Sequence, residues 1–253
     1  MRITLLLSLL LAALGLGFLT ACSQKAGVTL VVTGSSTVAP VVAEAAARFE
    51  QSHPGVRIDV QTGGSSRGIA DVLSGVAALG MISRELTADE TELVAHPIAV
   101  DGVGVIVHRD NPISSLDRQQ LIDIYTGKTN NWMSFGGSDS RITLISKAEG
   151  RATLEVFLGY TGLDSADIKA DVIIGENQQA IKTVAGNPLA IAYVSIGAAA
   201  SEAGAGTPVK LLSCDGVAAT SATVASGAFP ITRPLQLVSR GELPPPRAPS
   251  STS

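Results

Sequence analysis

Turns rich in serine, threonine and glycine carry the chemistry that this sequence offers. The first of them, Thr33 to Pro40, follows an apolar run that ends at Val32 and precedes a helical pattern that begins at Val41. A turn from a strand into a helix leaves backbone N–H groups unpaired at the positive end of the helix dipole. With hydroxyls beside them, these groups suit a small anion. The same side chains also act as ordinary helix caps, so one turn alone leaves both roles open.

Further turns of the same kind follow later strands. The turn from Thr62 to Gly68 comes after a strand pattern at 56–61, and the turn from Ser83 to Glu85 comes after a strand pattern at 77–82. Strands and helices alternate over this part of the chain, which predicts a parallel sheet. Because the carboxyl ends of parallel strands meet at one edge of a sheet, we expect these turns to lie on one rim.

The chain then repeats the pattern in a second unit. The apolar segment 98–108 is long for one strand and indicates a connector between two lobes, and the polar turn from Lys147 to Thr153 again lies between a strand and a helix. We therefore predict an α/β protein in which each lobe is a mixed, mostly parallel sheet flanked by helices. The expected division is a signal peptide at 1–21, a discontinuous first lobe at 22–103 and 197–240, a second lobe at 104–196 and a flexible Pro- and Ser-rich tail at 241–253.

Composition excludes several classes of function. The chain has 253 residues, a net charge of −4 and 4% aromatic residues. Nucleic acid usually needs a basic face and aromatic platforms, so it is not expected as a partner. Cys22 and Cys214 are the only cysteines, and no Cys and His cluster is present. A structural disulfide, a metal site and a cofactor are therefore not expected.

The N-terminal segment has the pattern of an export signal. Arg2 precedes an apolar run at 5–19, and Leu19-Thr20-Ala21-Cys22 resembles the lipobox of bacterial lipoprotein signal peptides. A transmembrane anchor is the alternative, but the run is short and ends at a small-residue cleavage site. The resemblance implies cleavage before Cys22 and lipid on its thiol. The protein is then expected in the periplasm or at the outer face of the cell membrane, anchored by that lipid.

Several motifs together are similar to the short-form phosphate-binding proteins of phosphate ABC importers. Each motif alone is weak, but their order along residues 28–240 is specific. In chain order they are Gly34-Ser35-Ser36-Thr37, Gly63-Gly64-Ser65-Ser66-Arg67-Gly68, Gly80-Met81-Ile82-Ser83-Arg84-Glu85-Leu86, Asp101-Gly102-Val103-Gly104-Val105-Ile106-Val107, Leu121-Ile122-Asp123-Ile124-Tyr125-Thr126-Gly127-Lys128 with Trp132, Ala190-Ile191-Ala192-Tyr193-Val194-Ser195, and Pro230-Ile231-Thr232-Arg233-Pro234-Leu235.

The resemblance implies a two-lobe periplasmic-binding-protein fold of type II with an anion in the cleft. It implies a monomer that binds inorganic phosphate, catalyses no reaction, uses no cofactor and delivers its ligand to the permease subunits of an ABC transporter. The residues it assigns to the ligand come from three first-lobe turns and one second-lobe turn. They are Ser36, Thr37, Ser65, Ser66, Ser83, Arg84, Gly150, Arg151 and Thr153.

The sequence departs from the family at the ligand. The second-lobe turn reads Gly150-Arg151-Ala152-Thr153 where relatives often have Gly-Ser-Gly-Thr, so a hydroxyl is replaced by a guanidinium. Longer members also use a buried carboxylate to accept the proton of phosphate, and the matching position here is Ser83. Glu149, Glu85 or Asp101 could take that role. Phosphate rather than sulfate or molybdate is therefore implied by the resemblance alone.

The C-terminal part departs as well. Relatives continue after the Pro-Ile-Thr-Arg-Pro strand into an amphipathic helix that covers the first lobe, whereas this chain reads Gly241-Glu242-Leu243-Pro244-Pro245-Pro246. Consecutive prolines do not form a helix. We therefore expect a partly uncovered apolar patch on the first lobe.

Two other functions are weaker hypotheses. The segment Gly64-Ser65-Ser66-Arg67-Gly68 fits the Gly-x-Ser-x-Gly turn of serine hydrolases, with His96 or His108 as the base. A secreted hydrolase is less favoured because a single motif matches often by chance. A surface lipoprotein that works only through protein contacts is the other alternative, which failure to bind any oxyanion would favour.

Overall fold

The computed structural model describes residues 27–243. The signal peptide, the lipidation site Cys22 and most of the predicted tail lie outside the described residues. Among residues 27–243, no helix has the length and apolar character needed to cross a membrane.

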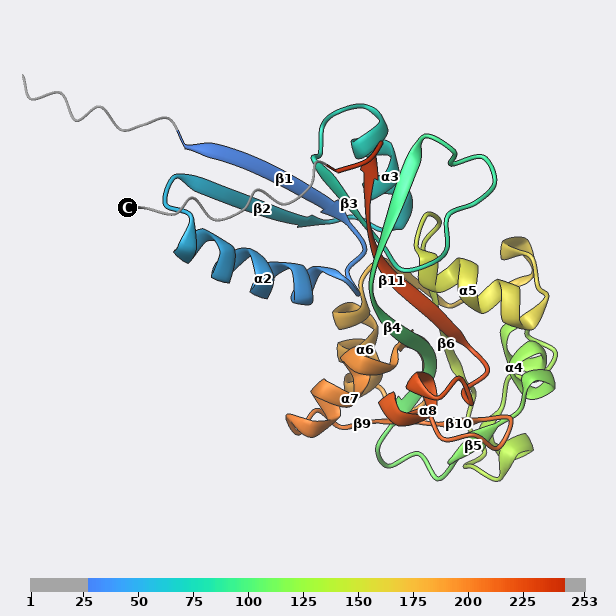
Figure 1. The fold of residues 1–253 in the computed structure, drawn as a ribbon. Helices are drawn as coiled ribbons and strands as arrows, with labels where there is room; N and C mark the ends of the chain where they lie inside the picture. Colours follow the sequence, from blue (N-terminus) through green and yellow to red (C-terminus); the bar gives the residue numbers. More distant parts are fainter. Residues whose placement is uncertain (1–26, 244–253) are drawn as a thin grey trace, which may run out of the picture.

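A curled, mixed sheet runs through the molecule in the order β2-β1-β3-β11-β4-β8-β6-β7. Its first strands are β1 (Val28–Gly34), β2 (Val56–Thr62) and β3 (Leu79–Ile82), and β1 pairs in parallel with both of the others. The parallel sheet predicted for the N-terminal part is therefore confirmed. The carboxyl ends of all three strands point toward the middle of the molecule, where the two lobes meet (Figure 1).

Two long strands connect the lobes. Strand β4 (Leu93–His108) and strand β11 (Thr232–Arg240) run antiparallel to each other. Beyond β11, the second half of β4 pairs with β8 (Ala190–Ser195) and β9 (Val209–Leu211), and β6 (Thr143–Lys147) joins β8 to β7 (Val172–Ile174). The two lobes are thus built on one continuous sheet, and β4 and β11 form the crossing between them.

Helices cover the sheet on both sides. In the first lobe, Met81 faces helix α2 (Ala39–Ser52) and its neighbour Ile82 faces helix α3 (Ser65–Leu73), because successive side chains of a strand point to opposite faces. The remaining elements surround the second lobe: β5 (Ser115–Leu116), α4 (Arg118–Tyr125), η1 (Trp132–Phe135), α5 (Ala152–Thr161), η2 (Ser165–Asp167), α6 (Asn177–Gly186), α7 (Ile196–Gly204), β10 (Ser213–Cys214) and α8 (Ser221–Ala225).

The segment 197–231 lies with the second lobe, although the sequence pattern placed it in the first. Strand β9 pairs with β4 at Ile106 to His108, and β10 pairs with β5. Phe229 and Ile231 belong to the same buried core as Trp132. We therefore propose that the return to the first lobe begins at β11 and not at residue 197.

Residues 87–92 form turns, in which the Glu90 carboxylate accepts the Thr87 N–H and binds Arg84. Helix α4 begins at Arg118. Asp117 is its N-cap, and Ser115 pairs with β10.

Candidate functional site

A group of hydroxyls gathers where the two lobes meet. Ser35 and Thr37 lie in the turn between β1 and α2, Ser65 is the first residue of α3, Ser83 follows β3, and Thr153 is in the first turn of α5. We call these five residues the hydroxyl cluster. All but Thr37 are less than 7% exposed.

Hydrogen bonds join the three turns of the first lobe. Ser35 Oγ donates to Ser83 Oγ at 3.0 Å, and the Ser83 N–H donates to Ser65 Oγ at 3.1 Å. Gly34 makes this approach possible, because its φ is +133° and a Cβ there would lie 2.2 Å from the Met81 carbonyl oxygen. The turns therefore lie side by side, as the parallel order of their strands predicted.

Arg233 draws the cluster together across both lobes. It lies on β11 and is 2% exposed. Its Nη1 donates to Thr153 Oγ1 at 2.8 Å and to Ser83 Oγ at 3.4 Å, and its Nη2 donates to Thr37 Oγ1 at 3.1 Å. Hydroxyls from the first and the second lobe thus share one guanidinium.

Asp101 holds this guanidinium in place. Its Oδ2 accepts from Arg233 Nε at 3.2 Å and from Nη2 at 2.9 Å, and both side chains are buried. The two residues are direct cross-strand partners in the register of β4 and β11. The ion pair is therefore fixed by the strands that connect the lobes.

The helices that begin at the cluster have N-termini without side-chain caps. No side-chain cap bond is present at the start of α2, α3 or α5. By contrast, side chains of Asp117, Ser195 and Thr220 cap helices α4, α7 and α8. These ends place first-turn backbone donors and positive dipole ends at the interlobe region, where the Thr37 N–H already donates to Ser35 Oγ and the Ser66 N–H to the Gly150 carbonyl oxygen.

Lys147 adds a buried amine from the end of β6. It is 4% exposed, and its Nζ donates to the Glu176 carbonyl oxygen at 2.9 Å. Burial lowers the pKa of Lys147 from 10.5 to about 7. The Glu176 carboxylate favours the charged form, whereas the Arg233 and Arg151 guanidinium groups oppose it.

Arg151 is paired inside the second lobe. Its Nη1 lies 2.6 Å from Glu176 Oε1. Its side chain also packs against the first lobe, since a Cβ at Gly64 would lie 2.8 Å from Arg151 Cδ. Arg151 therefore lies at the junction of the lobes, with its charge matched by a carboxylate.

Arg84 forms an ion pair between the lobes. It follows β3 in the first lobe, and its Nη2 lies 2.7 Å from Glu90 Oε1. Its Nε lies 2.7 Å from Glu155 Oε2, on helix α5 of the second lobe. In this structure Arg84 binds carboxylates and makes no hydrogen bond to the hydroxyl cluster.

The other predicted residues lie at the edge of the cluster. Ser66 is exposed, and its N–H donates to the Gly150 carbonyl oxygen across the cleft at 3.3 Å. Ser36 lines a neighbouring groove, while its neighbour Ser35 points into the cluster. Of the predicted residues, the structure thus brings together Thr37, Ser65, Ser83 and Thr153.

Of the three carboxylates left open by the sequence, Asp101 is the one that contacts the cluster, through Arg233. Glu149 is exposed and accepts a hydrogen bond from Ser165. Glu85 is exposed and lies 3.4 Å from the Gln236 side-chain nitrogen.

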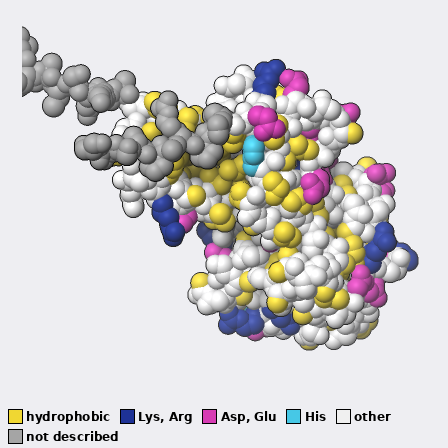
Figure 2. Space-filling model, viewed as in Figure 1, with side chains coloured by type: hydrophobic (Ala, Val, Ile, Leu, Met, Phe, Trp, Pro, Cys, Tyr) yellow, Lys and Arg dark blue, Asp and Glu magenta, His cyan; other side chains and the backbone are white. Residues whose placement is uncertain are grey.

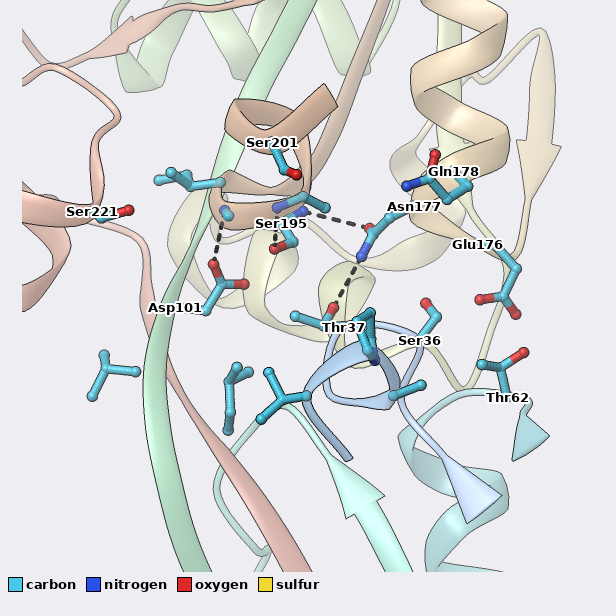
Figure 3. Close-up of a pocket in the computed structure, with 18 of the residues that line it drawn as sticks. Ser36, Thr37, Thr62, Asp101, Glu176, Asn177, Gln178, Ser195, Ser201 and Ser221 are labelled. Carbon is cyan, nitrogen blue, oxygen red and sulfur yellow. Dashed lines mark hydrogen bonds between the residues drawn. The ribbon is translucent and has the colours of Figure 1, made fainter. Parts of the chain in front are cut away.

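A large groove lies beside the cluster, on the side of helices α2, α7 and α8. It has a volume of about 1030 Å³, and Thr37, Asp101 and Asn177 form part of its wall. Figure 3 shows Asn177 between Thr37 and Ser195, to which it is hydrogen-bonded. Thr37 therefore belongs both to the hydroxyl cluster and to the wall of the groove.

The groove continues into exposed apolar surface on the first lobe. Val41 and Val100 line it and are 53% and 62% exposed. Figure 2 shows apolar side chains gathered over the crossing of β4 and β11. The described residues therefore include exposed apolar surface on the first lobe, as the sequence predicted.

The geometry that a serine hydrolase requires is not present in residues 27–243. His96 Nε2 is hydrogen-bonded to Ser239 Oγ at 2.8 Å, and His108 Nδ1 accepts from the Asp110 N–H at 3.2 Å. Neither histidine contacts Ser66. The same residues hold no group of His, Cys, Asp and Glu that could bind a metal ion.

Sequence reasoning missed Ser35, Arg233, Lys147 and Asn177 as residues of the candidate site. Arg233 was noted only as part of a strand motif. The available signal was a charged residue among the apolar residues and prolines of the motif Pro230-Ile231-Thr232-Arg233-Pro234-Leu235. Lys147 gave a similar signal, because it directly follows the apolar strand pattern at 142–146. Asn177 had no signal, since its role depends on contact with the other lobe.

Comparisons with known proteins agree with this architecture. Residues 20–250 match the PBP superfamily domain. The chain is 32% identical over 225 residues to the phosphate-binding protein PstS of Bacillus subtilis (strain 168). The match covers 87% of this chain and 72% of that protein. A shorter match of 111 residues to PstS 2 of Streptococcus pneumoniae serotype 4 (strain TIGR4) is 38% identical and covers 44% of this chain and 38% of that one.

Solved structures lead to the same family. A phosphate ABC transporter substrate-binding protein with bound phosphate from Clostridium perfringens has a TM-score of 0.77 and 32% identity, covering 83% of this chain and 86% of that one. An ABC-type phosphate transport receptor from Vibrio cholerae has a TM-score of 0.68 and 28% identity, covering 85% and 88%. The chain therefore belongs to the periplasmic-binding-protein superfamily and, within it, to the family of phosphate-binding proteins of phosphate ABC importers.

Proposed function

We propose that this chain is an extracytoplasmic solute-binding lipoprotein that captures inorganic phosphate between its lobes and delivers it to an ABC permease. One observation carries the proposal. Hydroxyls from both lobes, Ser83 and Thr37 from one and Thr153 from the other, lie within hydrogen-bond reach of a single buried guanidinium. The phosphate named for the relatives supports phosphate as the ligand.

Neutral donors would hold the anion. Ser65, Ser83, Thr37 and Thr153 supply hydroxyls, and the uncapped starts of α2, α3 and α5 supply backbone N–H groups. Three predicted residues remain candidates at the edge of the cluster: Ser36, Ser66 and Gly150. Arg84 and Arg151 also remain candidates, but their N–H groups would have to be divided between their carboxylate partners and the ligand.

Lys147 would supply the balancing charge. An anion taken out of water needs compensation by a cation or by many hydrogen bonds. The Arg233 and Arg151 charges are matched by Asp101 and Glu176. The Lys147 ammonium donates to a backbone carbonyl, which leaves donors for a ligand.

Binding and release would use a hinge at β4 and β11. Contacts that depend on closure include Asn177 Nδ2 to Thr37 Oγ1 at 3.0 Å and the Ser66 N–H to the Gly150 carbonyl. An anion held by both lobes binds the closed form more tightly and so shifts the population toward it. Opening would then release the ligand to the permease.

Removal of one cluster hydroxyl tests the site. We expect Thr153→Val to weaken phosphate binding roughly ten- to a hundredfold, because a hydrogen bond to a charged group is lost. Isothermal titration calorimetry with phosphate and with sulfate measures this. Thr183→Val is the matched control, since its hydroxyl bonds only to Gln179 within helix α6. Sulfate binding as tight as phosphate binding would favour the alternative of a general receptor for oxyanions such as sulfate or molybdate.

The pKa of Lys147 gives a pH test. With the pKa near 7, the ligand-free protein at pH 8 holds a mostly neutral Lys147, whereas a bound anion favours the ammonium form. Phosphate binding at pH 8 should therefore take up protons, seen as a dependence of the binding enthalpy on the buffer's ionisation enthalpy. Phosphate itself titrates in this range, so the measurement is the difference between wild type and Lys147→Met. Equal uptake by both proteins would contradict the role.

The lowered pKa of Lys147 also predicts how the stability of the ligand-free protein depends on pH. Its unfolded chain binds the Lys147 proton up to a pKa of 10.5, while the folded chain releases it near 7. The contribution of this group to the free energy of unfolding therefore rises with pH between these values. Urea denaturation measures the free energy of unfolding of wild type and of Lys147→Met at each pH. The difference between the two proteins should rise with pH between 7 and 10.5 and must not change with pH below 7.

The ion pair between Arg84 and Glu155 should favour closure. Glu155 is partly exposed, so we expect Glu155→Gln to weaken phosphate binding by up to about fivefold, and less at high salt. Glu92→Gln is the control, because it removes a pair with Arg240 inside the first lobe. An affinity for phosphate that does not change at any salt concentration would count against this contribution to closure.

Lipid anchoring rests on the lipobox pattern at Cys22, outside the described residues. We expect wild-type protein in the membrane fraction of an expressing bacterium and Cys22→Ser protein in the soluble fraction. Cys214→Ser is the control. Equal fractionation of the three proteins would refute the anchor without touching the ligand proposal.

A further inference from the structure

We propose that Arg233 is a positioning residue that does not bind the anion and instead orients the hydroxyl protons that do. This role rests on the proposed function and adds a determinant of specificity to the site. It differs from that of an ordinary anion-binding arginine, which would direct its own N–H groups at the ligand.

The donors of Arg233 are fully used by the protein. A guanidinium has five N–H bonds in a fixed fork. Nε and one N–H of Nη2 bind Asp101, the other N–H of Nη2 binds Thr37, and Nη1 binds Thr153 and Ser83. Each N–H therefore has a protein acceptor, and the charge is matched by Asp101 at 2.9 Å. Arg233 therefore acts on a ligand by positioning the hydroxyls that bind it, and not by attracting it with an unpaired charge.

These bonds fix the direction of the hydroxyl protons. A hydroxyl has one proton to donate and two lone pairs that accept. Thr37 Oγ1 accepts from Arg233 Nη2 at 3.1 Å and from Asn177 Nδ2 at 3.0 Å, so both lone pairs are occupied. Ser83 Oγ likewise accepts from Ser35 Oγ and from Arg233 Nη1. Only the protons of Thr37 and Ser83 remain available.

The remaining hydroxyls follow the same rule. Thr153 Oγ1 accepts from Arg233 Nη1 at 2.8 Å, and Ser65 Oγ accepts from the Ser83 N–H at 3.1 Å. The cluster thus presents donors to a ligand and few acceptors. Such a surface suits an anion with bare oxygens and disfavours a neutral polyol or sugar, whose own hydroxyls would lack acceptors.

The backbone makes the arrangement rigid. Arg233 and Asp101 face each other in the register of β11 and β4, and Asp101 Oδ1 also accepts from the Gly197 N–H at 3.3 Å. Thr153 comes from the second lobe, so its proton is oriented only when the lobes are in contact. Orientation of the donors is therefore coupled to closure.

Arg233→Lys separates geometry from charge. Lysine keeps the positive charge beside Asp101 but lacks the planar fork that reaches three hydroxyls. We expect phosphate affinity, measured by calorimetry, to fall roughly ten- to a hundredfold in Arg233→Lys, as in Arg233→Met. Arg240→Lys is the matched control, because Arg240 lies on the same strand in an exposed pair with Glu92. Affinity in Arg233→Lys within about twofold of wild type would overturn the proposal.

A double-mutant cycle distinguishes positioning from a general structural role. If Arg233 orients Thr153, then Thr153→Val should cost much less affinity in the Arg233→Lys background than in wild type. A purely structural arginine would leave that cost unchanged, and such additivity would overturn the proposal. Thermal denaturation of each variant checks that it is folded.

Asn177 provides a second route if Arg233→Lys does not fold. Asn177→Ala removes the other donor to Thr37 Oγ1 and leaves the Arg233–Asp101 pair intact. The cycle of Asn177→Ala with Thr37→Val should then show coupling in phosphate affinity, and additivity would overturn the proposal. Wild-type protein that binds no phosphate would overturn the proposed function and this role together, whereas binding without coupling would overturn this role alone.

Discussion

The buried ion pair between Arg233 and Asp101 is the interaction on which the rest of the site depends. Two charges held at 1% and 8% side-chain exposure are costly to remove from water, and such a pair is kept only where its other hydrogen bonds are also satisfied. Here the acceptors that satisfy Arg233 are the hydroxyls of the cluster. Removal of one partner would leave a buried charge unmatched, which costs about 3–5 kcal/mol. The same ion pair therefore stabilises the crossing strands and holds the hydroxyls of the site in place.

The position of the pair explains how a single sheet can serve two lobes. Strands β4 and β11 cross between the lobes side by side, and their facing residues at Asp101 and Arg233 lie level with the cluster. The first lobe contributes its turns at the ends of parallel strands, and the second contributes Thr153 at the start of α5. A change in the angle between the lobes would break the bonds that Thr153 and Asn177 make across the junction and leave the first-lobe bonds between Ser35, Ser65 and Ser83 intact. The first lobe can thus keep its half of the site in an open form.

The sequence was informative where local pattern decides structure and uninformative where distant contacts do. Strand-to-helix turns at Ser35, Ser65 and Ser83 could be placed on one rim, because parallel strands end at the same edge. Arg233 could not be placed there from the sequence, since its partner Asp101 is 132 residues away.

Under the proposed function, selectivity for phosphate over sulfate would depend on an acceptor for the proton that phosphate carries. A cluster of hydroxyl donors treats phosphate and sulfate alike, so the proton of phosphate must find an acceptor elsewhere. Of the three carboxylates named from the sequence, Glu149 and Glu85 are exposed, which leaves Asp101. Both of its oxygens already accept, Oδ2 from Arg233 and Oδ1 from the Gly197 N–H at 3.3 Å. A carboxylate oxygen has a second lone pair, so Oδ1 retains capacity for one more donor. Discrimination in favour of phosphate would therefore require the ligand proton to reach Oδ1 of the residue that also anchors Arg233, which joins selectivity and donor orientation in a single side chain.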